Sequence, residues 1–495
     1  MAGLVLLFIN IAYTAISIPL GLFYLGKEQF GVWALAQQIA GYFLLLDFGM
    51  TAAVSRLIAN RKSSVNGGEY GSLLLTGGWV LGVQAVSIFF LGAGFSFFAP
   101  FLFGVPPSLA GVFQECLLLL AVVSALSLAS RAIGIPLWAF QRMDVINSCM
   151  TMNLVFSLAT LWIGLHVGWG INSLAVAGLP GVFWTAGSSF FVCRTQAFYP
   201  SKNRWGRPSW KIFFQCFGFA KDVFLIGIGS QLVNASQVMV VSKVLGLEAA
   251  AVFSVGTKVY TLAYQICTKV IQNSIAGLTD LYVQGLKENF RKRVFDLFGV
   301  VGSLAASASC FLILFNTEFV KYWTDHRIVF SLSGDVLLGF LLVPVVCSVA
   351  GIETFISMGF LHAVRYLRLV EGLLVVTGCF WAAHGFGLVG ILSVLFFISL
   401  MGFAFCVLQI RRYLSDFVSF IGIFMAKSFS LLALVSVFKV LLECSSLPFF
   451  LKLFLSLLGC FLSCAGIIRF FFGPALRQEI FSFCKRFFTG RAPLL

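Results

Sequence analysis

Apolar runs of about 20 residues recur from one end of the chain to the other, separated by short polar or basic stretches. An α-helix rises about 1.5 Å per residue, so each run is long enough to cross a hydrocarbon core of roughly 30 Å. The pattern therefore predicts an all-α polytopic membrane protein with about 14 transmembrane helices. We expect them near residues 1–25, 31–55, 71–98, 110–130, 145–166, 172–193, 216–242, 250–281, 296–317, 334–360, 364–384, 387–410, 419–442 and 449–473.

The expected helix at 250–281 differs from the others because two lysines, Lys258 and Lys269, lie eleven residues apart within it. Eleven residues return to about 20° from the starting direction of an α-helix, so both lysines share one face. The same face carries Thr261, Gln265 and Gln272, within about 60° of that line. A cationic stripe inside a membrane is costly unless it faces protein or water, so it marks a hypothetical functional site. It suggests a path for a polar, anionic ligand.

Composition excludes an ordinary soluble protein, because 60% of the 495 residues are hydrophobic and only 10% are charged. The 13 cysteines are scattered singly and the four histidines are dispersed. None shows the spacing of a metal site, and no soluble region is large enough to need disulfides. We therefore expect no metal and no cofactor.

The net charge of +15 is mainly a topology signal. Most of the 33 Lys and Arg residues fall in alternate loops, which the positive-inside rule places in the cytoplasm together with both termini. Because these charges are spread along the chain, nucleic acid is not an expected partner, whereas anionic membrane lipids are. The basic regions are 56–62, 131–142, 194–221, 287–293, 365–368, 411–412 and 469–491.

A weak internal repeat divides the chain. Shifting the sequence by 220 residues aligns YLGKEQFGV (24–32) with VLGLEAAAV (244–252). Polar residues of the preceding helices align in the same register: Asn10, Thr14 and Ser17 with Ser230, Asn234 and Gln237. Six helices separate the copies, so both start on the same side of the membrane. This predicts two parallel six-helix bundles around a central cavity, related by an axis along the membrane normal.

The expected domain organisation follows from this repeat. It comprises an N-terminal six-helix bundle at 1–193, a cytoplasmic linker at 194–215, a C-terminal six-helix bundle at 216–410, two accessory transmembrane helices at 411–473 and a basic cytoplasmic tail at 474–495.

Two segments resemble a known family. Residues 24–59 contain Leu-Gly-x-Glu-x-Phe-Gly-x-Trp followed by Leu-Asp-x-Gly, and WAFQRMDVIN (138–147) follows the fourth expected helix. Both are similar to motifs of bacterial polysaccharide flippases of the O-antigen type. These belong to the polysaccharide transporter family of the multidrug/oligosaccharidyl-lipid/polysaccharide (MOP) exporter superfamily.

The resemblance implies a function in cell-surface polysaccharide biosynthesis. Such a flippase passes a polyprenyl-pyrophosphate-linked oligosaccharide across the bacterial inner membrane by alternating access, with a cationic lumen around the headgroup. It also implies a coupling ion, H⁺ or Na⁺, and partners among the polysaccharide polymerase and export machinery.

The candidate binding residues come from the polar stripes. Anion contacts are expected from Lys258 and Lys269. The alternative is that each lysine extends its apolar stem towards the membrane surface, Lys269 on the cytoplasmic side. The amide candidates are Gln265, Gln37, Gln38, Asn234 and Gln237. Amides of this kind either bind sugar hydroxyls or join helices to one another, and the sequence leaves both interpretations open.

The candidates for gating or coupling are Asp47, Arg131 and Glu353. Arg131 and Glu353 occupy similar places in the fourth and tenth expected helices. They either pair across the two halves or serve separately at the membrane interface. Pro180 is expected to bend the sixth helix.

Two alternative functions within the superfamily stay open. Multidrug antiporters typically have twelve helices and an acid in helix one, whereas helix one here has no acid. Lipid II flippases tend to place arginine near helix one, where this chain has Asn10 and Thr14. A membrane enzyme is not expected and no catalytic residue is assigned, because the outer loop at 318–333 holds no nucleophile–base pair.

Overall fold

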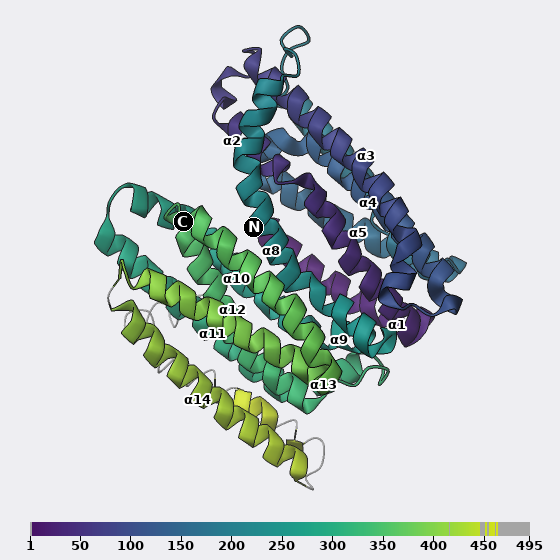
Figure 1. The fold of residues 1–495 in the computed structure, drawn as a ribbon, viewed down its shortest axis with the longest axis vertical. Coiled ribbons are helices and arrows are strands. Elements are labelled where there is room, and N and C mark those ends of the chain that lie inside the picture. Colours follow the sequence, from purple (N-terminus) through teal and green to yellow (C-terminus); the bar gives the residue numbers. More distant parts are fainter. Residues whose placement is uncertain (1, 415, 446–450, 453–454, 461, 464–495) are drawn as a thin grey trace, which may run out of the picture. The chain divides into compact units, whose positions relative to one another are not determined.

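The computed structural model describes residues 2–414, 416–445, 451–452, 455–460 and 462–463. In this part of the chain the regular structure consists of α-helices α1–α14, two short 3₁₀ turns and the helical residues 451–452, 455–460 and 462–463, without a β-strand. Within the described residues, ten helical stretches are long and apolar enough to cross a membrane (Figure 1). The chain is therefore a multi-pass all-α membrane protein, as the hydrophobic pattern predicts.

Glycines divide two of these stretches into pairs of expected helices. Helix α1 (Ala2–Phe43) is interrupted at Gly26, and α13 (Leu361–Ile410) is interrupted at Gly387. The last expected helix, 449–473, lies only partly within the described residues.

The expected helix at 250–281 appears as two shorter helices. Helix α9 (Leu247–Gly256) is followed by α10 (Lys258–Val283), and neither is among the ten apolar stretches. The break between them falls immediately before Lys258.

The internal repeat reappears in the backbone. Gly26 has φ 73° and ψ 178°, and its aligned partner Gly246 has φ 91° and ψ 174°. Both angle pairs are essentially confined to glycine. The repeated Leu-Gly motif thus breaks the helix in the same way at both places.

Unit 1 is one of two compact units and comprises Met1–Val255, Lys321–Ile328 and Arg365–Gly387. Its main core is a cluster of buried side chains that includes Leu35, Leu81 and Phe113. Besides α1, α9 and the first part of α13, its helices are α2 (Met50–Ala59), α3 (Glu69–Phe103), α4 (Pro107–Ala139), α5 (Met143–Val167), α6 (Asn172–Val176), α7 (Leu179–Thr195) and α8 (Trp210–Leu245).

The sixth expected helix is divided where a bend is predicted. Helix α6 ends at Val176, and α7 begins at Leu179 with Pro180 in its first turn. Proline is tolerated there because the first turn of a helix has no intrahelical acceptor for its N–H groups.

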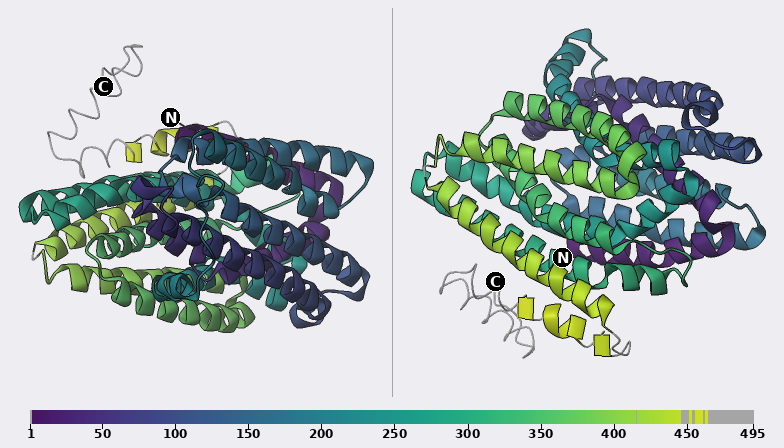
Figure 2. Two further views of the ribbon diagram at one scale, coloured as in Figure 1. Left: turned by 90° about the horizontal axis from the view of Figure 1, so that it is seen from above. Right: turned by 60° about the horizontal axis from the view of Figure 1, so that its bottom comes forward.

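Unit 2 comprises Gly256–Val320, Val329–Val364 and Leu388–Leu495. The two units do not coincide with the bundles expected at 1–193 and 216–410, whose boundaries stay a prediction. Helix α14 packs on α12 and runs along the edge of unit 2 (Figure 2). The helices of this unit are α10, α11 (Lys287–Trp323), α12 (Leu332–Ser357), the second part of α13 and α14 (Phe417–Cys444).

A buried carboxylate ties the helices of unit 2 together. Asp335 is fully buried near the start of α12 and accepts hydrogen bonds from the side chain of Asn316 at 2.6 Å and the backbone N–H of Thr317 at 2.9 Å. Asn316 also donates to the carbonyl oxygen of Gly256 at 3.0 Å. The break between α9 and α10 is therefore held by side chains from α11 and α12.

Candidate functional site

Helix α10 has two unlike faces. Its exposed polar residues include Gln265, Lys269 and Gln272. At about 100° per residue, these three lie about 140–200° around the helix from Cys267, on the buried face. The buried side chains are Cys267, Ile271 and Leu278, and α12 packs against the helix. The polar stripe expected from the sequence therefore points away from the core of unit 2.

Lys258 occupies a special position on this stripe. It is half-buried and is the first residue of α10, directly after the helix break. Neither Lys258 nor Lys269 has an ion pair or a side-chain hydrogen bond with another described residue. Non-helical backbone at membrane depth is tolerated where it is buried in protein or lines a cavity. The role of Lys258 as an anion contact stays a prediction.

The candidate amides lie on α1 and α8 of unit 1. Gln37 and Asn234 are exposed, whereas Gln38 and Gln237 are half-buried. Asn234 and Gln237 each donate to a carbonyl one turn earlier in their own helix, at 2.8 and 2.6 Å. Both hydrogen bonds stay within α8, so they do not link α8 to another helix.

Asp47 has a structural role. Its Oδ1 accepts hydrogen bonds from the backbone N–H of Thr51 at 3.1 Å and from the hydroxyl of Thr51 at 2.9 Å. These bonds satisfy a donor at the start of α2, where the backbone N–H groups have no partner within the helix. Arg131 lies in unit 1 and Glu353 in unit 2, so their pairing and the gating roles stay predictions.

Two partly buried ion pairs in the structure are not among the predictions made from the sequence. Arg365 pairs with Asp222, joining α13 to α8 within unit 1. Arg368 pairs with the buried Glu371 at 2.9 Å, one turn along α13. In the sequence these residues look like loop charges or isolated acids, and no pattern indicates which helices meet.

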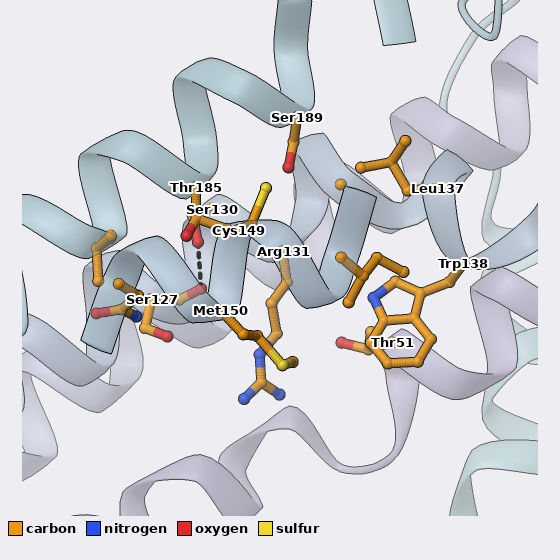
Figure 3. A pocket seen from close by; sticks show the side chains of 14 residues that line it. Thr51, Ser127, Ser130, Arg131, Leu137, Trp138, Cys149, Met150, Thr185 and Ser189 are labelled. Atoms are coloured by element: carbon orange, nitrogen blue, oxygen red, sulfur yellow. Dashed lines mark hydrogen bonds between the residues drawn. The ribbon is translucent and has the colours of Figure 1, made fainter. Parts of the chain in front are cut away.

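A cavity of about 370 Å³, lined by hydroxyl-bearing and apolar side chains, lies within unit 1, between α2, α4, α5 and α7. We call it the arginine pocket, because Arg131 is the one charged residue among those that line it (Figure 3). The lining residues are Thr51, Ser127, Ser130, Arg131, Gly134, Leu137, Trp138, Ile146, Cys149, Met150, Asn153, Val182, Thr185 and Ser189.

Arg131 is half-buried, eight residues from the end of α4 at Ala139, which corresponds to roughly 12 Å along the axis. It has no ion pair or hydrogen bond with another described residue. An arginine at this depth is costly unless it faces protein, water or a ligand. The sequence singles out Arg131 as a charge, but the hydroxyl-lined cavity around it depends on the packing of four helices.

No protein-family model and no curated protein sequence matches the chain. Solved structures, in contrast, match the chain. A multidrug resistance MATE family transporter of the MOP superfamily, in an inward-facing conformation, is similar with a TM-score of 0.70 and 14% identity, over 83% of this chain and 98% of that chain.

Two further structures share the fold. The MATE multidrug transporter DinF-BH has a TM-score of 0.63 and 15% identity, over 83% of this chain and 93% of that chain. A MOP superfamily transporter from Pyrococcus furiosus, described by a reverse polarity of its binding pocket, has a TM-score of 0.57 and 14% identity, over 83% and 94%. The chain thus has the fold of MOP superfamily transporters.

Proposed function

We propose that the chain is a flippase that moves a polyprenyl-pyrophosphate-linked oligosaccharide across a bacterial inner membrane by alternating access. The polar face of α10 would contact the anionic headgroup, while the polyprenyl tail stays in the bilayer. The transporter fold and the resemblance of residues 24–59 to polysaccharide flippases support this proposal.

The observation that carries the proposal concerns three basic side chains among the candidate residues that have no ion-pair or hydrogen-bond partner in the described part of the chain. Lys258 and Lys269 on α10, and Arg131 in the arginine pocket, have no bonded partner among the described residues. A cation without a protein partner attracts an opposite charge, so these positions favour an anionic substrate over a cationic one.

Four acids of the described helices and turns have hydrogen-bond or ion-pair partners, whereas the carboxylate of Asp280 on α10 has none among the described residues. Asp47 is bonded to Thr51, Asp222 to Arg365, Asp335 to Asn316 and Thr317, and Glu371 to Arg368. A carrier of organic cations needs carboxylates that are available to the substrate or the coupling ion.

A cation-coupled multidrug antiporter is the competing function, because several structures with this fold are multidrug transporters. The transporter from P. furiosus is described by a reversed pocket polarity and a suggested different function. Pockets of different polarity therefore occur on this fold, and the unpaired cations here favour the flippase.

The decisive experiment compares transport in cells. Deletion of the gene is expected to trap a lipid-linked oligosaccharide on the cytoplasmic leaflet, which leaflet-selective enzymatic labelling detects. The Lys258→Ala/Lys269→Ala variant should not relieve this accumulation, because the headgroup loses both point charges of α10. Membrane levels of the variant must match those of the unchanged protein.

Lys427→Ala is the matched control, since Lys427 is an exposed lysine on α14, away from α10. It should restore transport fully. Absence of any trapped lipid-linked oligosaccharide after gene deletion would refute the flippase function. Full activity of the double lysine variant would refute the role of α10 and leave the function standing.

A further inference from the structure

The arginine pocket has two chemically different ends. Figure 3 shows the guanidinium of Arg131 at the end of an extended side chain, well separated from the hydroxyl of Ser189. Ser130 and Thr185, which also line the pocket, donate to carbonyls of their own helices at 2.8 Å. Their oxygen lone pairs therefore stay available as acceptors. A ligand that spans the pocket would meet a cation at one end and hydroxyl oxygens at the other.

The walls of the pocket suit a ring. Trp138 lines the pocket and is 43% exposed, so part of its indole is open to a ligand. An aromatic side chain offers a flat apolar surface, while serine and threonine hydroxyls exchange hydrogen bonds with other hydroxyls. The volume of about 370 Å³ lies at the small end of the range of ligand pockets.

Gly134 keeps this space open. A side-chain carbon placed on it would lie 3.5 Å from the Ser189 hydroxyl oxygen, which is ordinary van der Waals contact. The position is therefore not one where the backbone demands glycine. A methyl group there would fit without forcing α4 and α7 apart at that contact, and a larger side chain would reduce the volume of the cavity.

We propose that the arginine pocket binds one acidic sugar unit of the transported saccharide, with its carboxylate on Arg131 and its hydroxyls on the serine and threonine side. The fork of the guanidinium matches a carboxylate in two parallel hydrogen bonds. This proposal rests on the proposed function for its saccharide substrate. It assigns the specificity for an acidic sugar to unit 1, apart from the lysines of α10.

Binding to the purified full-length chain tests the assignment. Saturation-transfer NMR with methyl β-glucuronide, and with methyl β-glucoside as its neutral counterpart, gives the two affinities. We expect the glucuronide to bind at least about tenfold more tightly, as one charge-assisted hydrogen-bonded contact provides. Arg131→Gln should abolish this difference, and Gly134→Leu should weaken both ligands.

Arg194→Gln is the matched control. Arg194 is an exposed arginine of unit 1, at the end of α7, and does not line the pocket. The thermal unfolding midpoint of each variant shows whether it is folded, and Gly134→Ala provides a milder filling of the cavity if the leucine variant is not.

Three results would overturn the assignment. These are equal affinity for both sugars in the unchanged protein, a glucuronide preference that survives Arg131→Gln, and a pocket in which inorganic phosphate displaces the glucuronide at equal concentration. The last would assign the pocket to a bare phosphate. These are binding results on the purified protein, whereas failure of the flippase function would appear in cells as the absence of a trapped lipid-linked oligosaccharide, so the two failures are distinguishable.

Discussion

The ion pairs of this chain differ in how far water can reach the two charged groups. In α13 the side chains of Arg368 and Glu371 are 13% and 4% exposed, and they pair at 2.9 Å. Arg61 and Glu69 form a comparable pair at 3.1 Å, but their exposures are 32% and 81%. Removing one partner of a buried pair leaves an uncompensated charge, whereas an exposed charge is solvated by water.

We expect Arg368→Gln to destabilise the protein by about 3 kcal/mol, because the carboxylate of Glu371 would remain buried without its cation. Glu371→Gln should cost less, since the longer arginine side chain can move its charge towards solvent. Thermal unfolding of the purified protein in detergent measures both effects as shifts of the midpoint.

Arg61→Gln is the control for the loss of a pair that is open to solvent. It should lower the stability by no more than about 1 kcal/mol. Equal midpoint shifts for Arg61→Gln and Arg368→Gln would mean that water reaches Glu371 and that the pair contributes as a surface pair does.

Single residues were predictable where the signal is local. The alternation along α10 places Lys269 and Gln265 opposite a buried stripe, because helical periodicity is a property of one segment. The structural role of Asp47 also has a local signal, Thr51 four residues later. Glu371 has a local partner in Arg368, three residues earlier, but its burial, like the arginine pocket, depends on helices far apart in the sequence.

At the scale of helices, the positions at which helices break shape the fold as much as the lengths of the helices do. Gly26 and Gly246 end helical segments at equivalent points of the repeat, with φ of 73° and 91°. The break at Gly26 leaves the preceding carbonyls without partners within the helix. Arg327 donates to two of them, Leu22 at 2.8 Å and Phe23 at 3.3 Å, within unit 1. The guanidinium charge also favours the negative end of that helix.

Gly246→Ala should destabilise the protein by about 1–3 kcal/mol, because an alanine side chain is strained at φ 91° and ψ 174°. No atom lies within 4 Å of the added carbon, so the strain would come from the backbone alone. The shift of the thermal unfolding midpoint relative to the unchanged protein measures the effect.

The matched control is Gly218→Ala in the interior of α8, where the added carbon also meets no atom within 4 Å. Alanine is a better helix former than glycine by about 1 kcal/mol, so this variant should be at least as stable as the unchanged protein. If Gly246→Ala behaves like Gly218→Ala, the non-helical break after α8 is not required.

Most helices could be predicted because each apolar run is long and separated from the next by charges. The interruption of the second expected helix, 31–55, could not be predicted from the sequence. A 3₁₀ turn at Leu44–Asp47 precedes Phe48, which has a positive φ of 49°. A phenylalanine rarely adopts this conformation, and it gives no sequence signal for it. The close packing of Gly49 against the α8 residues Ala220 and Val223 stabilises this break through contacts that arise only on folding.

At the scale of the whole molecule, each unit gathers basic loops at one end. In unit 1 the loops that carry Lys62, Arg142 and Lys202 are joined by hydrogen bonds, for example from Arg142 to Gln196 and from Ser201 to Asn66 at 3.0 Å. In unit 2 Arg291, at the start of α11, pairs with Asp416 beside the start of α14. Basic loops are retained in the cytoplasm, so we expect both ends to face it.

Reporter fusions within the loops test this orientation in a bacterial host. Alkaline phosphatase folds only outside the cytoplasm, whereas a green fluorescent reporter fused at the same residue fluoresces inside. We expect phosphatase activity at Asp325, between α11 and α12, and fluorescence at Lys202 and Gly285, because few basic residues lie near Asp325 and many lie near the other two. Phosphatase activity at Lys202 and Gly285, with fluorescence at Asp325, would show that the orientation is opposite to the expected one. The same reporter active at Gly285 and Asp325 would show that α11, the helix between them, does not cross the membrane.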